Sequence, residues 1–168
     1  DTTRANKNVI RWDGWCCVDV DDYEFEGDLK DDLVRRFHEY RFVCYSTASS
    51  TRSTPKFRLV FPLTETVPNT RIRSFWYALQ SELGELGDKQ TKDLSRMYYI
   101  PGKYATADNF IFSNRDADFI DASELCITGN KLSFLKISRL FNNLNNLSEH
   151  DCMIDECAAT LTGKIITL

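Results

Sequence analysis

Residues 41–47 and 56–63 are two strand-like segments joined by one Ser/Thr-rich loop, and this pair constrains the fold most. Both segments are rich in β-branched and aromatic residues, which favour strands. Two strands joined by so short a connection pair in antiparallel fashion, because parallel strands need a longer crossover. The chain therefore predicts a small antiparallel or mixed sheet rather than a doubly wound parallel fold.

Hydrophobic periodicity predicts the other elements of the first 128 residues. The expected elements are a strand at 15–20, a helix at 28–40 with Asp28 as N-cap, a helix at 69–86, short strands at 97–100 and 109–113, and a helix at 121–127. This order defines an α+β domain with helices packed against a sheet. Residues 1–14 are polar and are expected to form a partly ordered arm.

The 168 residues suffice for one domain with a small appendage. We expect a core at 1–128 and a helical appendage at 129–168, with helices at 131–148 and 152–161. No run of 18 apolar residues occurs, so no membrane-spanning helix is expected. The chain begins at Asp1 without a Met, and we expect it to be a piece of a larger protein. The six cysteines lack regular spacing, which favours buried free thiols in a reducing compartment.

The net charge of −4 hides a division into three parts. Residues 1–44 hold 7 basic and 11 acidic side chains, residues 45–105 hold 9 and 5, and residues 106–168 hold 5 and 9. A basic middle part can present a positive face to a phosphate ligand even in an acidic chain. Chance clustering explains the same numbers, so the charge distribution alone does not show whether this part binds a phosphate ligand.

The segment from Val18 to Asp22 carries the strongest local signal. Side chains repeat every two residues in a strand, so Asp19 and Asp21 project from one face. Two neighbouring carboxylates are costly unless a positive group lies beside them, and a divalent cation fills that role in phosphoryl transfer. The alternative is that the strand simply ends in solvent at these acids.

Two further segments carry candidate ligands. The loop after residue 47 is rich in hydroxyls, and the next strand brings Lys56 and Arg58 to one face, as a triphosphate site requires. An ordinary polar hairpin explains the same residues. Asp93 is a candidate third metal ligand and Arg96 a candidate phosphate ligand, or else they are a helix cap and a surface charge.

Together these segments resemble the archaeo-eukaryotic-type primases, and more closely the primase-polymerase domains of phage and plasmid replication proteins. That family has an apolar-Asp-apolar-Asp strand, a strand that ends in Ser-x-His, and then a third acidic motif. Residues 45–63 follow the viral and plasmid form of the second motif closely, and the resemblance covers about residues 15–102.

The resemblance implies a sheet of the RNA-recognition type and template-directed nucleotidyl transfer by two Mg²⁺ or Mn²⁺ ions. The implied metal ligands and catalytic residues are Asp19, Asp21 and Asp93. The implied nucleotide-binding positions are Ser46, Thr47, Ala48, Lys56, Arg58 and Arg96. The expected template contacts are Arg52, Arg71, Arg73 and Lys103. The expected partners are single-stranded DNA, nucleoside triphosphates and a helicase, in a bacterial or viral-host cytoplasm and away from membranes.

Ala48 departs from this pattern, because the family has a phosphate-contacting His at that position. The loss of one such contact costs on the order of 10²–10³ in rate. Either Ala48 is an engineered substitution that disables the enzyme, or the chain is a natural member that has lost or rerouted this step. The competing hypothesis is a non-catalytic DNA-binding module of a replication initiator, which Ala48 favours and the Asp19/Asp21 pair opposes.

Other classes of protein fit less well. A metal-dependent nuclease lacks a good general base near the acids, and a rolling-circle nickase lacks paired histidines. No phosphate-binding Gly-x-x-x-x-Gly-Lys-Ser/Thr motif of an NTP-driven motor occurs. The spacing of the candidate zinc ligands fits no common zinc site; these are Cys126, His150, Cys152 and Cys157.

Overall fold

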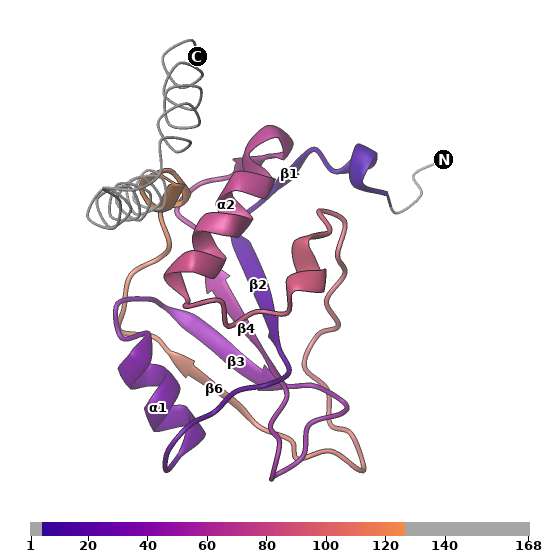
Figure 1. Ribbon diagram of the computed structural model, residues 1–168, viewed down its shortest axis with the longest axis vertical. Helices are drawn as coiled ribbons and strands as arrows, with labels where there is room; N and C mark the ends of the chain where they lie inside the picture. Colours follow the sequence, from indigo (N-terminus) through magenta and orange to yellow (C-terminus); the bar gives the residue numbers. More distant parts are fainter. Residues whose placement is uncertain (1–4, 127–168) are drawn as a thin grey trace, which may run out of the picture. The chain divides into compact units, whose positions relative to one another are not determined.

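Four strands form an antiparallel sheet whose spatial order differs from their order in the chain (Figure 1). A computed structural model describes residues 5–126, apart from the side chain of residue 90. The strands lie in the order β2 (Trp15–Val20), β4 (Phe57–Pro62), β3 (Phe42–Ser46) and β6 (Ile111–Asn114). Both β2 and β3 are antiparallel to β4, which lies between them, so β2, α1 and β3 form a split β–α–β unit.

Two helices cover one face of this sheet (Figure 1). Alternate strand residues such as Val18, Leu59 and Phe42 form the core with Leu33 of α1 (Leu29–Arg36) and Phe75 of α2 (Asn69–Glu82). This arrangement confirms the α+β class and the antiparallel sheet. The alternating side chains on the other face of the sheet are left for other contacts.

The helices begin where the sequence predicts. The Asp28 side chain caps α1 by accepting the backbone N–H groups of Lys30 and Asp31 at 2.9 and 3.1 Å. α1 ends earlier than expected, because Phe37 leaves the helical conformation. α2 ends at Glu82, and the two residues that take positive φ just beyond it are Gly84 and Glu85.

Some segments differ from the sequence prediction. Residues 97–100 do not form the expected strand. The expected polar arm contains the 3-10 turn η1 (Asn6–Asn8) and the strand β1 (Arg11–Trp12), which pairs with β5 (Val67–Pro68). A second 3-10 turn, η2 (Lys89–Lys92), follows α2.

The last elements reach the end of the described chain. Residues 122–126 are helical, in agreement with the helix expected at 121–127. The helices predicted within 129–168 lie outside the described residues, so the domain division at residue 128 stays a prediction. No helix in residues 5–126 is long and apolar enough to cross a membrane.

Candidate functional site

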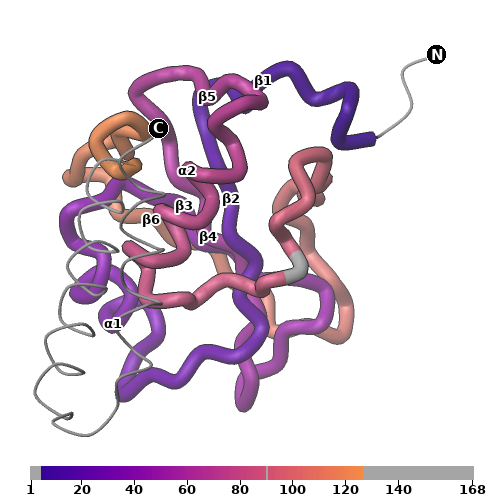
Figure 2. Tube along the Cα trace, turned by 45° about the horizontal axis from the view of Figure 1, so that its top comes forward, coloured from indigo at the N-terminus to yellow at the C-terminus, as the bar shows by residue number. Residues whose placement is uncertain are grey.

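The face of the sheet opposite the helices carries the candidate site, and we call it the open face. Its side chains alternate with those of the core and include Cys17, Asp19, Arg58, Val43 and Tyr45. Asp19, Arg58 and Tyr45 are direct cross-strand neighbours, so they form one row across three strands. The chain after η2 lies on the same side of β2 as the N-terminal arm (Figure 2). Residues 96–99 of this segment contact the row.

Asp19 is the centre of this row. Its side chain accepts from Nε of Arg58 at 2.5 Å and from Nη2 of Arg96 at 3.4 Å. Asp19 is only 7% exposed, so these guanidinium groups supply the positive charge that a buried carboxylate needs. We call Asp19, Arg58 and Arg96 the Asp19 cluster; it carries one negative and two positive charges.

A second acid–base pair extends the row toward the end of the strand. Nζ of Lys56 lies 3.4 Å from Oδ1 of Asp21, and the two side chains are 32% and 50% exposed. The pair therefore lies in solvent, where ion pairs are weak. Asp21 follows the end of β2 and Lys56 precedes the start of β4, so a cation from the β4 segment lies beside each of the two acids.

Tyrosines hold the covering segment against Arg58. The Tyr45 hydroxyl donates to the Tyr99 carbonyl at 2.9 Å, Nη1 of Arg58 donates to the same oxygen at 3.3 Å, and Arg58 stacks over Tyr98. Burial by itself lowers the pKa of Arg58, but the adjacent Asp19 carboxylate and Tyr45 together outweigh burial and raise that pKa. Burial also raises the pKa of Tyr45. Arg58 is therefore a fixed, fully charged group.

The expected metal ligands are arranged differently from a two-metal site. Asp93 accepts the backbone N–H and the hydroxyl of Ser95 at 3.2 and 3.0 Å, which places its carboxylate in a local turn. Within residues 5–126, no three His, Cys, Asp or Glu side chains gather closely enough to hold a metal ion. Because arginines already occupy Asp19, the residues as arranged do not fit the two ions. Three of the zinc candidates, His150, Cys152 and Cys157, lie outside the described residues.

The expected phosphate-binding hydroxyls have structural partners. Ser46 is buried, and its Oγ accepts the backbone N–H of Phe110 at 3.1 Å. Oγ1 of Thr47 lies 3.4 Å from Oγ of Ser49 in the following turn. Ala48 is exposed in that turn. The structure therefore brings Lys56, Arg58 and Arg96 to the open face, whereas the Ser46 hydroxyl supports the β3–β6 edge.

The expected template contacts are dispersed. Arg52 is exposed in the loop before β4. Arg71 and Arg73 belong to α2, on the opposite side of the sheet, where Nη2 of Arg71 donates to Ser123 at 3.1 Å. Lys103 lines a cavity of about 430 Å³ at the end of β3. The structure gathers none of these four into the Asp19 cluster.

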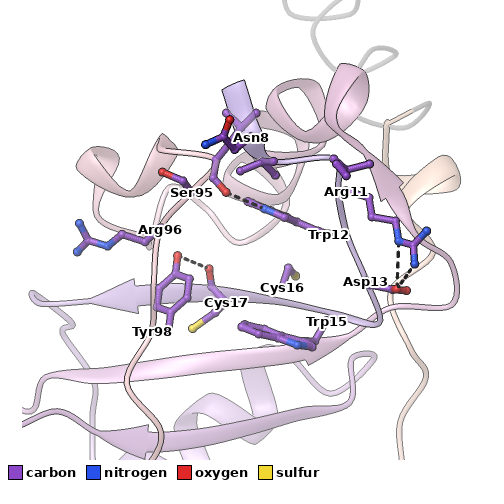
Figure 3. Close-up of a pocket in the computed structure, with 13 residues that line it drawn as sticks. Asn8, Arg11, Trp12, Asp13, Trp15, Cys16, Cys17, Ser95, Arg96 and Tyr98 are labelled. Atoms are coloured by element: carbon purple, nitrogen blue, oxygen red, sulfur yellow. Dashed lines mark hydrogen bonds and ion pairs between the residues drawn. The ribbon is translucent and has the colours of Figure 1, made fainter. Parts of the chain in front are cut away.

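A larger cavity beside the cluster was not predicted from the sequence. It has a volume of about 750 Å³ and lies between the N-terminal arm, the start of β2 and residues 94–98 (Figure 3). Trp12, Trp15 and Tyr98 border it, and so does Arg96 of the Asp19 cluster. Trp12 and Trp15 are close together in the sequence, but residues 94–98, which form the other wall, are distant from them in the chain. Only the fold brings the two segments together.

The fold and site together define a small α+β domain in which helices cover one face of the sheet and the other face carries the Asp19 cluster beneath the segment after η2. The comparison with protein families is more specific, because the model of the VapE N-terminal domain matches residues 1–129. The chain belongs to this family, which is a domain of replication-associated proteins of phages and plasmids. Searches of curated proteins and of solved structures give no match.

Proposed function

We propose that this domain performs template-directed nucleotidyl transfer in primer synthesis or DNA polymerisation. The observation that carries the proposal is the Asp19 cluster, in which a buried carboxylate fixes two arginines on the open face. Fixed guanidinium groups bind phosphate oxygens in pairs, with little loss of side-chain freedom. Membership of a replication-associated family supports a nucleotide as the phosphate ligand.

Arg58 and Arg96 have the roles of triphosphate ligands in this proposal, with Lys56 at the solvent side. The cluster has an excess of positive charge, so a triphosphate is attracted to it and competes with Asp19 for the guanidinium groups. The proposed partners are nucleoside triphosphates, a single-stranded DNA template and a helicase, in the cytoplasm. Dependence on Mg²⁺ or Mn²⁺ stays a prediction, and the arrangement of the acids supports no step through these ions.

Primer extension on a single-stranded template tests the reaction. The chain itself is expected to extend primers weakly or not at all, because Ala48 offers no phosphate contact. Ala48→His places an imidazole in an exposed turn, where the fold tolerates it, and is expected to raise extension at least about tenfold, or about 1.4 kcal/mol of transition-state stabilisation. Each variant is assayed with Mg²⁺ and with Mn²⁺.

Asp19→Asn is introduced into the unchanged chain and into the Ala48→His variant. It is expected to abolish primer extension in both, because the arginines lose the negative charge that fixes them. Asp116→Asn is the matched control, since Asp116 is exposed after β6 and away from the cluster. Full activity of Asp19→Asn would exclude the cluster from the reaction.

A non-catalytic DNA-binding module is the second candidate function. The pairing of Asp19 with two arginines favours it, because a carboxylate used in this way serves to position cations. This function predicts that the chain and Ala48→His bind single-stranded DNA equally and that neither extends a primer.

A further inference from the structure

The cavity beside the Asp19 cluster has mainly aromatic and apolar walls. Figure 3 shows the rings of Trp12 and Trp15 at its border, with Cys16 between them. Trp15 is 50% exposed, and its ring meets Tyr98 edge to face at a centroid distance of 6.3 Å. A large aromatic side chain half exposed at the wall of a cavity offers a surface for a flat ligand.

The polar groups of these walls are largely satisfied within the protein. The Trp12 indole N–H donates to the Leu94 carbonyl at 3.1 Å, and the Tyr98 hydroxyl donates to the Cys17 carbonyl at 3.1 Å. Burial raises the pKa of the Cys16 and Cys17 thiols, so both stay neutral at physiological pH. Trp12 and Tyr98 therefore present mainly ring surface to a ligand, beside the half-exposed ring of Trp15. The ligand portion that fits among these rings is flat and uncharged.

Arg96 connects the cavity with the other members of the Asp19 cluster. It lines the cavity, and its side chain extends away from the rings of Trp15 and Tyr98, with Nη2 3.4 Å from Oδ2 of Asp19 (Figure 3). A ligand with a flat ring among the tryptophans can place an anionic group at Arg96 and reach toward Arg58. This combination of a flat ring and a phosphate describes a nucleotide.

We propose that this cavity binds an unpaired nucleobase, with the attached phosphate at Arg96. The inference rests on the proposed function in taking a nucleotide as the ligand, and it adds a base-binding site beside the phosphate-binding arginines. A free nucleoside triphosphate and a base of single-stranded DNA share this chemistry, and the test separates them.

Binding measurements on the whole chain use probes with and without a base. The free probes are ATP and inorganic tripolyphosphate, and the strand probes are a dT oligonucleotide and an abasic oligonucleotide of equal length. Trp15→Leu removes the stacking surface and keeps an apolar side chain, so it is expected to weaken binding of ATP, of the dT oligonucleotide, or of both, about tenfold. Binding of tripolyphosphate and of the abasic strand is expected to be unchanged.

Three further variants make the result specific. Trp15→Phe keeps an aromatic face and is expected to retain most of the affinity. Arg96→Ala removes the phosphate contact and is expected to weaken tripolyphosphate as well as ATP. Tyr77→Ala is the control, because Tyr77 is a 55% exposed aromatic residue on α2, away from the cavity, and is expected to have no effect.

Photo-crosslinking tests the site without a substitution. 5-Iodo-dUTP and an oligonucleotide that contains 5-iododeoxyuridine are irradiated separately with the chain, and the crosslinked peptides are mapped. Crosslinks at Trp12, Trp15 or Tyr98 support the site, and the reactive probe identifies the source of the base. Crosslinks confined to other residues would overturn the site. So would a loss of affinity in Trp15→Leu that is equally large for probes with a base and for probes without one.

The outcome is independent of the primer-extension test. Base-dependent binding at Trp15 without any primer extension would contradict the proposed reaction but support the base-binding site. Primer extension that Trp15→Leu leaves unchanged, together with crosslinks at other residues, would contradict the base-binding site but support the proposed reaction.

Discussion

Arg58 and Asp19 depend on each other at the level of single residues. They face each other across β4 and β2, and their side chains are only 15% and 10% exposed. Removal of one partner of a buried ion pair leaves the other charge without compensation, which costs more than the pair itself contributes. Arg96 compensates part of this loss, because it also contacts Asp19.

Arg58→Ala is therefore expected to lower the free energy of unfolding by about 2–4 kcal/mol. Asp19→Asn combined with Arg58→Ala is expected to cost less than the sum of the two single changes, with a coupling of about 1–3 kcal/mol. Urea unfolding of the four chains measures both quantities.

Lys56→Ala is the matched control for this cycle. It breaks the neighbouring pair with Asp21, which is exposed, so the expected loss is below about 1 kcal/mol. Equal losses for Lys56→Ala and Arg58→Ala would show that burial does not distinguish the two pairs.

At the level of elements, the turn after α2 fixes the chain that covers the open face. The backbone N–H of Gly87 donates to Oε1 of buried Gln80 at 3.0 Å, and that of Asp88 donates to the Asp19 carbonyl at 2.9 Å. A Cβ atom at Gly87 would overlap both the Gln80 amide and Cγ1 of Val18. The turn therefore joins α2 to the edge of β2 through a contact that only glycine permits.

Gly87→Ala is expected to lower the free energy of unfolding by about 1–3 kcal/mol, as overpacking does in a filled core. Gly102→Ala serves as the control, because a Cβ there meets only Tyr104 at ordinary contact distances, the nearest atom at 3.5 Å. Thermal and urea unfolding measure the difference. A loss of the same size at Gly102 would contradict the close approach at Gly87.

Most elements of the sheet and both long helices were predictable, because their periodicity extends over five residues or more. The strand β2 agrees with the prediction at 15–20 at both ends. The β1–β5 pair was not predictable, since two residues per strand carry no periodic signal. Residues 97–100 have the composition of a strand, but side chains of Tyr45 and Arg58 occupy the Tyr99 carbonyl.

The site was predictable only in part. Alternation places Asp19 with Asp21 and Lys56 with Arg58 on one face, but it contains no information on the register between the two strands. The register sets Arg58 opposite Asp19, so the positive charge beside this carboxylate, which the sequence pattern predicts to be a metal ion, is an arginine of the protein itself. The position of Arg96 depends on the path of the chain after α2, which no local pattern encodes.

At the scale of the whole described domain, the two faces of the sheet carry different chemistry. The helix-covered face holds the apolar core, whereas the open face holds the Asp19 cluster with the aromatic cavity beside it. The free thiols of Cys16 and Cys44 lie in the core, and that of Cys17 lies on the open face. All three are buried, so their protons link the folding of the domain to pH.

Burial raises the pKa of Cys16, Cys17 and Cys44 above the ordinary value of 9.0. Above that pH the unfolded chain releases these protons and the folded chain keeps them, so stability falls as pH rises. Below it the thiols contribute no pH dependence.

Each thiol is expected to contribute a decline of about 1.4 kcal/mol per pH unit above pH 9, or about 4 kcal/mol per unit for the three together. Urea unfolding at a series of pH values between 7 and 10.5 measures this slope. Cys17→Ala isolates one contribution, because Cys17 lies outside the main core cluster and its removal leaves the packing around Cys16 and Cys44 in place. The variant is expected to lose stability less steeply, by about 1.4 kcal/mol per pH unit, while other titrating groups affect both chains alike. Identical slopes for the two chains would mean that the Cys17 thiolate forms as readily in the folded domain as in the unfolded chain.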